Sequence, residues 1–194
     1  LTFHRQMVMF NWPGVTTVVA GNCGFTIVST RSEHYDVIVR TLENVEDMDS
    51  ATLTAGIVWE FETFPQYADL VRTRGTALNF TSYVGHSALR LYVLGDAAYE
   101  RAATPSEIER MCSLVVEAIG AGAAGFSTSF SFAHRGVDGK PVPSRFAARD
   151  EVEALFLAAG STGKGVVLAT PGPQCSYPDF YALLQSEEKK QDDR

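Results

Sequence analysis

Cysteine is scarce in this sequence of 194 residues, which contains only three, Cys23, Cys112 and Cys175, far apart along the chain. A sparse, odd set excludes the dense disulfide framework of small secreted domains and fits free thiols in a reducing compartment. No stretch approaches the roughly 18 apolar residues of a membrane-spanning helix, and residues 1–12 lack the ordered regions of a signal peptide. These absences predict a cytoplasmic protein that has no membrane partner.

Basic clusters and nucleotide-binding loops are also missing. The formal net charge is −7, and Lys and Arg gather only in the mixed-sign segment Glu187–Arg194, which argues against a nucleic-acid partner. No G-x-G-x-x-G follows the first apolar β-rich run, and neither G-x-x-x-x-G-K-[ST] nor the G-x-S-x-G elbow of serine hydrolases occurs. The sequence therefore offers no reason to expect nucleotide binding or a serine nucleophile.

What is present is the composition of one ordinary folded domain. Hydrophobic residues make up 45% and charged residues 20% of the chain, and about 100 to 200 residues usually form one domain. Short apolar, β-rich runs predict four strands, and residues at helical spacing predict the helices between them. The predicted strands are 15–20, 76–84, 124–127 and 166–169, and the predicted helices are 31–44, 65–74, 105–119, 150–159 and 177–185.

Strands that alternate with helices indicate consecutive βα units. Such a series is typical of a doubly wound sheet or of a (β/α)8 barrel, and the missing nucleotide motifs favour the barrel. A complete barrel needs eight strands and about 250 residues. The prediction is therefore an α/β fold, a partial (β/α)8 TIM-type barrel with about four βα units and with open strand edges, a liability in an isolated domain.

Several motifs in order resemble one enzyme family. The first is Gly14-Val-Thr-Thr-Val-Val-Ala-Gly-Asn-Cys-Gly-Phe25, and the others are Trp59–Tyr67, Val84-Gly-His-Ser-Ala-Leu-Arg90, Met111 with Val115 and Glu117, and Gly122-Ala-Ala-Gly-Phe-Ser-Thr-Ser129. Over about residues 13–170 the chain is similar to the N-acyl-D-amino-acid deacylases (D-aminoacylases) of the amidohydrolase superfamily. The resemblance implies an amidohydrolase barrel, zinc, and a small-molecule substrate, an N-acyl-D-amino acid whose amide is hydrolysed.

The resemblance also implies site residues. The cysteine of the Gly-Asn-Cys-Gly motif, here Cys23, corresponds to a zinc ligand. Independently of the resemblance, a thiolate at the carboxyl end of a parallel strand would face a barrel mouth and suit Zn²⁺, although a lone cysteine is more often a small buried hydrophobe. Cys112 is expected in a helix core.

Four polar residues at strand ends are candidates for substrate binding. His86 and Arg90 match a Gly-His-x-x-x-Arg segment of the family and are expected to shape the mouth. The alternative is structural, with His86 bonded to backbone carbonyls and Arg90 paired with Asp96 or Glu100. Ser127 and Ser129 end the third strand, where their hydroxyls either bond a ligand or cap the following turn.

The chain also departs from the family pattern. No His-x-His precedes Pro13, and Pro171 occupies the position after the fourth strand where a metal-binding histidine is expected. His134 is a substitute ligand or an ordinary loop residue. No catalytic residue is assigned, and the division expected is a divergent segment 1–12, a partial barrel 13–185, and a charged, disordered tail 186–194.

Two hypotheses follow. In the first, the chain is an incomplete portion of a zinc-dependent amidohydrolase and is not a competent hydrolase by itself, because removing even one ligand normally weakens metal binding strongly. In the second, it is a non-catalytic remnant that acts as a binding or structural domain. Zinc analysis of the purified protein separates the two hypotheses.

Overall fold

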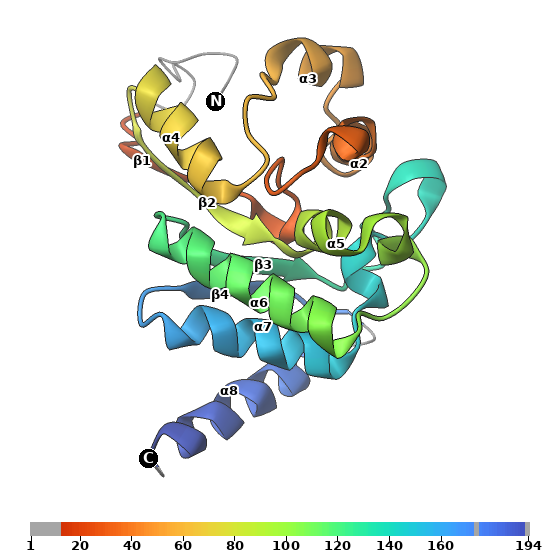
Figure 1. Cartoon of the computed structure of the whole chain (residues 1–194), viewed down its shortest axis with the longest axis vertical. Coiled ribbons are helices and arrows are strands. Elements are labelled where there is room, and N and C mark those ends of the chain that lie inside the picture. Colours follow the sequence, from red (N-terminus) through yellow and green to blue (C-terminus); the bar gives the residue numbers. More distant parts are fainter. Residues whose placement is uncertain (1–12, 173–174, 193–194) are drawn as a thin grey trace.

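The computed structural model describes residues 13–172 and 175–192. The segment 1–12, predicted to diverge from the family, lies outside the described residues. The described part of the chain holds one parallel sheet with helices packed against it (Figure 1). None of the helices in this part is long and apolar enough to cross a membrane.

Four strands form the sheet: β1 (Thr17–Ala20), β2 (Asn79–Gly85), β3 (Gly125–Ser129) and β4 (Val166–Thr170). Their spatial order is β1-β2-β3-β4, and every neighbouring pair is parallel. A doubly wound sheet reverses its strand order at a switch point, whereas a barrel adds each strand beside the previous one. The sequential order therefore decides between the two predicted folds in favour of the partial barrel.

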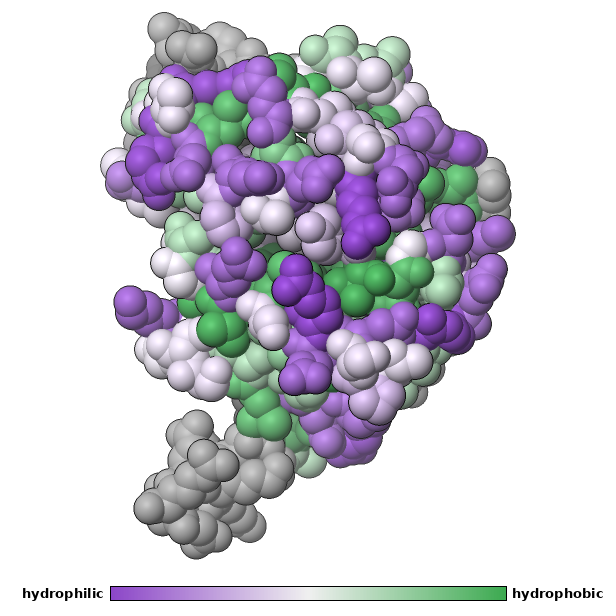
Figure 2. Space-filling model, viewed as in Figure 1, coloured by the Kyte–Doolittle hydropathy of each residue, from purple (hydrophilic) through white to green (hydrophobic). Residues whose placement is uncertain are grey.

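Helices connect the strands and cover the sheet. The first connection holds α2 (Tyr35–Glu46), α3 (Ser50–Gly56) and α4 (Phe64–Arg74), and the second holds α5 (His86–Leu94) and α6 (Pro105–Gly120). Helix α7 (Arg149–Ser161) precedes β4, and α8 (Tyr177–Asp192) follows it. Helices α4, α6 and α7 lie side by side in front of the strands in Figure 1, and hydrophilic side chains are spread over this face between smaller apolar areas (Figure 2). The polar outer face is the expected solvent side of amphipathic helices.

The N-terminus of α6 follows directly from its sequence. Thr104 and Glu107 form a capping box, in which the Thr104 hydroxyl accepts from the Glu107 backbone N–H and the Glu107 carboxylate accepts from the Thr104 backbone N–H. Pro105 supplies the first helical position, where its missing N–H costs nothing. Hydrogen bonds from Arg101, with those of Thr104, lower the pKa of the Glu107 carboxyl to about 2.

The core lies between the sheet and its covering helices. Val84 and Phe126 project from the strands onto Met111, Val115 and other buried side chains of the helices. Strand β3 is buried along its whole length, whereas Val19 of β1 is 41% exposed and Val166 of β4 is 55% exposed. Within the described residues β1 and β4 have a strand neighbour on one side only, so the predicted open edges are present.

Two helices and one helix end differ from the sequence prediction. Helices α3 and α5 were not expected; α5 begins at His86, and its side chains are nearly all buried, so it lacks the amphipathic spacing that reveals a helix in a sequence. The backbone of α8 is helical as far as Asp192, beyond the predicted end of this helix at residue 185. Glu, Lys and Gln have high helix propensity, which accounts for the extension.

Candidate functional site

The turn around Cys23 follows β1 at the carboxyl edge of the sheet. It is a short 3-10 segment, η1 (Asn22–Gly24), in which Gly21, Cys23 and Gly24 have φ angles of 82°, 57° and 81°. Glycine adopts this left-handed region freely, but a cysteine there is uncommon and needs support from its surroundings. The turn brings the Cys23 side chain to the edge where barrel enzymes carry their chemistry.

Ser127 on β3 supplies that support. Its hydroxyl donates to the Gly21 carbonyl at 2.5 Å and accepts from the Gly24 backbone N–H at 3.0 Å, so it joins both ends of the turn. A Cβ atom on Gly24 would lie 3.3 Å from the Ser127 carbonyl oxygen and the Thr128 Cα. The close packing of η1 on β3 thus depends on glycine at position 24. Ser127 is fully buried, and its hydroxyl positions the cysteine turn.

The Cys23 thiol faces the end of β4. Its Sγ accepts a hydrogen bond from the Thr170 hydroxyl at 3.3 Å, and the cysteine is partly exposed. A cysteine sulfur is a soft ligand that suits Zn²⁺. Cys23 therefore fits a zinc ion as one ligand. Among the described residues no group of three or more His, Cys, Asp or Glu side chains could hold a metal ion.

Ser129 and His134 lie close together after β3. The Ser129 hydroxyl is 2.7 Å from His134 Nδ1 and accepts from the Ser131 backbone N–H, so it caps the following turn. The His134 ring packs edge-on against Phe25, next to the cysteine turn, with ring centroids 5.0 Å apart. Burial lowers the pKa of His134, which keeps the imidazole neutral at pH 7. A role as metal ligand stays a prediction for this residue.

His86 and Arg90 lie on α5 and are fully buried. His86 Nε2 is 2.8 Å from one carboxylate oxygen of Glu151, and Arg90 Nη1 forms an ion pair with the other. Arg90 Nη2 also donates to the Arg101 carbonyl at 2.6 Å, and His86 Nδ1 is 2.8 Å from the Thr128 hydroxyl. The network joins α5, α7 and β3.

This network corrects the structural partners expected from the sequence. Arg90 pairs with Glu151 rather than with Asp96 or Glu100, and His86 bonds side chains rather than backbone carbonyls. Because neither His86 nor Arg90 is exposed, contact with a substrate would require the packed helices to open. Ser127 and Ser129 are also buried and bonded within the chain. Substrate binding by any of the four stays a prediction.

The protonation states in this network follow from burial and charge. Burial lowers the pKa of His86 although the Glu151 carboxylate accepts a hydrogen bond from the ring, so the imidazole is neutral. A neutral ring with its proton on Nε2 donates to Glu151 and accepts from Thr128, which satisfies both nitrogens. Burial alone would raise the pKa of Glu151, but hydrogen bonds from His86 and Arg90 and the charge of Arg90 outweigh it, and its pKa lies below the ordinary value.

Glu151 was missed in the sequence because an acidic residue in the first turn of a helix is usually a solvated partner of the helix dipole. The position of Glu151 within its helix nevertheless predicts burial. Glu151 lies four residues before Leu155 and eight before Ala159, both completely buried, so it falls on the inward stripe of α7. A carboxylate on such a stripe requires buried cationic partners.

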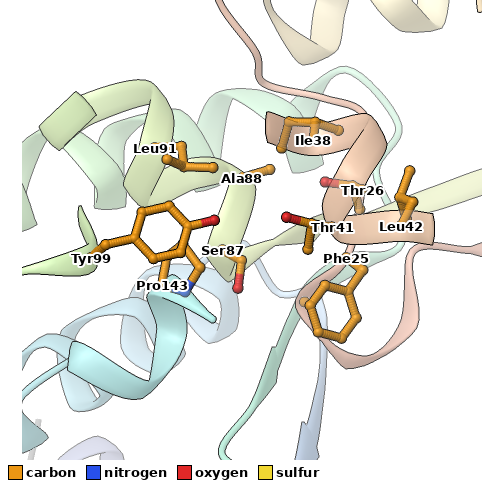
Figure 3. Close-up of a pocket in the computed structure, with 11 residues that line it drawn as sticks. Phe25, Thr26, Ile38, Thr41, Leu42, Ser87, Ala88, Leu91, Tyr99 and Pro143 are labelled. Carbon is orange, nitrogen blue, oxygen red and sulfur yellow. The ribbon is translucent and has the colours of Figure 1, made fainter. Parts of the chain in front are cut away.

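A small cavity lies behind the cysteine turn (Figure 3). Phe25 and Thr26 line it together with side chains of α2 and α5, among them Thr41 and Ser87, and Tyr99 reaches it from the segment after α5. Its volume of about 10 Å³ suffices for about one water molecule. The cavity is too small to receive an acylated amino acid.

No protein-family model matches the chain. It is 37% identical over 115 residues to the D-aminoacylase of Alcaligenes xylosoxydans xylosoxydans, and 32% identical over 128 residues to the N-acyl-D-aspartate deacylase of the same organism. A D-aminoacylase structure, from work on the functional role of its binuclear metal center, superposes with a TM-score of 0.60 at 29% identity. The chain is a homologue of part of the D-aminoacylases.

This D-aminoacylase homologue spans only a fraction of its relatives. The two matches cover 59% and 66% of this chain but 21% and 23% of the curated relatives, and the superposition covers 84% of this chain and 30% of that structure. The family resemblance and the partial amidohydrolase barrel predicted from the motifs are confirmed. The activity of the whole protein is a separate question.

Proposed function

We propose that these residues are part of a metal-dependent amidohydrolase that hydrolyses the amide of N-acyl-D-amino acids, and that Cys23 is a zinc ligand in it. The observation that carries the proposal is the construction of the cysteine turn. A cysteine with positive φ is held by Ser127 at both ends of its turn and receives the Thr170 hydroxyl on its sulfur. A cysteine that only filled space would need none of these contacts.

The roles of the residues follow from this geometry. A bound zinc ion would lower the pKa of a water molecule and polarise the scissile carbonyl. Cys23 would hold the ion at the mouth, Thr170 would orient the sulfur, and Ser127 would fix the turn in the conformation that presents it. Orienting partners of this kind typically change metal affinity about 10- to 100-fold when removed.

The remaining ligands and the general base are proposed to come from outside the described residues. We propose that the 194 residues alone do not hydrolyse the amide, since one thiolate does not make a catalytic zinc site, which normally has three protein ligands. A cytoplasmic location is proposed from the free thiols.

Release of the free amino acid from an N-acetyl-D-amino acid and from its L-enantiomer tests the activity. We expect zinc-dependent release from the D-form by the protein that contains these residues, at least about 100-fold slower after Cys23→Ser. Cys112→Ser is the matched control, because Cys112 lies on α6 away from the strand ends, and it should leave the rate unchanged. Equal rates in both variants would contradict the assignment of Cys23.

A second candidate is a non-catalytic domain that uses the same partial barrel for binding or structure. The observation that favours it is Pro171, which directly follows β4 where the family pattern places a histidine and which cannot bind a metal. In that case the protein would bind no zinc through Cys23, and Cys23→Ser would change neither metal content nor any activity.

A further inference from the structure

The cysteine turn rests directly on the backbone of two other elements. A Cβ atom on Gly24 would lie 3.3 Å from the Thr128 Cα and 3.5 Å from the His86 backbone nitrogen. A Cβ atom on Gly85 would lie 2.7 Å from the Gly24 carbonyl oxygen. Glycine is needed where one backbone approaches another this closely. The position of the turn therefore follows the positions of the end of β3 and the start of α5.

A side-chain hydrogen bond joins these two backbone segments. Gly85 and Ser127 are register partners in the sheet, and His86 and Thr128 are the residues that follow them. The Thr128 hydroxyl lies 2.8 Å from His86 Nδ1, and both residues are fully buried. Successive side chains of a strand point to opposite faces. Ser127 thus holds the turn on one face of β3, while Thr128 holds His86 on the other.

Glu151 fixes the His86 ring from its other side. A neutral ring that donates from Nε2 to the Glu151 carboxylate, 2.8 Å away, leaves Nδ1 as an acceptor for the Thr128 hydroxyl. All three residues are fully buried, so water does not compete for these hydrogen bonds. The order of carboxylate, imidazole and hydroxyl is that of a hydrolytic triad. The complete burial of Thr128 excludes that role, and the hydrogen bonds serve to orient the groups that they join.

We propose that the hydrogen bonds from Glu151 through His86 to Thr128 position the Cys23 thiol for zinc. The three are positioning residues, because they act through the backbone on which the cysteine turn rests. Thr170, which donates to the sulfur, lies on β4 beside β3, so a shift of β3 changes both the turn and its donor. The part that concerns zinc rests on the proposed function, whereas the positioning of the thiol does not need the metal.

Thr128→Val tests the proposal, because it keeps the shape of the side chain and removes the hydroxyl that bonds His86. In zinc-free protein that contains these residues, alkylation of Cys23 by iodoacetamide is followed by mass spectrometry of its peptide. We expect alkylation about 2- to 10-fold faster than in the unchanged protein, the equivalent of one lost hydrogen bond that kept the turn closed. Thr128→Ala removes the same hydroxyl and should act in the same direction. Thr128→Ser restores the hydroxyl and should restore the rate.

Zinc affinity, measured by competition with a chelator, gives a second readout. We expect about 10-fold weaker zinc binding in Thr128→Val and unchanged binding in Thr128→Ser. Ile119→Val is the control for lost stability. It shortens a core side chain on α6 that lies near Gly165, at the opposite end of the sheet from the turn, and it should change neither readout.

The outcomes separate this inference from the proposed function. An unchanged alkylation rate in Thr128→Val, or the same acceleration in Ile119→Val, would overturn the positioning role while zinc binding through Cys23 still stood. Unchanged zinc affinity in Thr128→Val, in a protein that binds zinc through Cys23, would also overturn it. If the unchanged protein binds no zinc through Cys23, the proposed function fails, and the alkylation rates alone decide the positioning role.

Discussion

Polar residues on the helix side of the sheet and polar residues at the carboxyl ends of the strands are held in different ways. On the helix side, His86, Arg90 and Glu151 are fully buried, and Glu151 bonds both of the others. At the mouth, Cys23 is partly exposed, and its sulfur is bonded by a single hydroxyl, that of Thr170. Polar side chains that bond one another join the helices to the sheet, whereas the cysteine proposed as a zinc ligand is partly exposed.

The largest effect is expected when the buried network is broken. Glu151→Ala leaves the Arg90 charge buried without its carboxylate, which typically costs about 3–5 kcal/mol of unfolding free energy. Urea denaturation measures the change. Glu153→Ala on the same helix removes an exposed pair with Arg149 and should cost no more than about 0.5 kcal/mol. Similar losses of unfolding free energy in the two variants would contradict the proposed difference between the buried network and an exposed ion pair.

Gly85→Ala tests the junction between the two regions. A Cβ at this position would lie 2.7 Å from the Gly24 carbonyl oxygen and from the Thr26 hydroxyl oxygen. We expect a loss of about 1–3 kcal/mol from overpacking, with displacement of the cysteine turn. Gly120→Ala on α6 meets no atom within 4 Å and should be neutral or stabilising by up to about 1 kcal/mol. Denaturation midpoints of the two variants measure these changes in stability.

The buried network should make stability depend on pH. The pKa of His86 is lowered by burial, so the unfolded chain binds a proton more readily than the folded one, and stability falls as the pH drops below about 6.5. The lowered pKa of Glu151 adds a further loss in the acid range below its ordinary value. In urea titrations between pH 7 and 5, His86→Gln should show a smaller decline than the unchanged protein. An identical decline would assign it to other groups, such as His134.

Cys23→Ser should have the smallest effect on folding. It weakens only one hydrogen bond, from Thr170, and leaves the bonds between Ser127 and the turn in place. We expect a change of less than about 1 kcal/mol in the free energy of unfolding. A loss as large as that of Glu151→Ala would show that Cys23 belongs to the core rather than to the mouth.

Local sequence patterns predicted the sheet and the cysteine turn well, because each strand and each cap depends on neighbouring residues. The α6 capping box and the four strands are examples. The partner of Arg90 could not be found in this way, since Glu151 lies 61 residues away on a different helix. Helix α5 was missed because burial on all sides removes the polar face that marks a helix in a sequence.

The assignment of Cys23 is tested most directly by X-ray absorption at the zinc edge of the purified protein that contains these residues. We predict one sulfur neighbour at about 2.3 Å from the metal, absent after Cys23→Ser and retained after Cys112→Ser. Zinc bound through nitrogen and oxygen alone, or a protein that holds no zinc, would contradict the account.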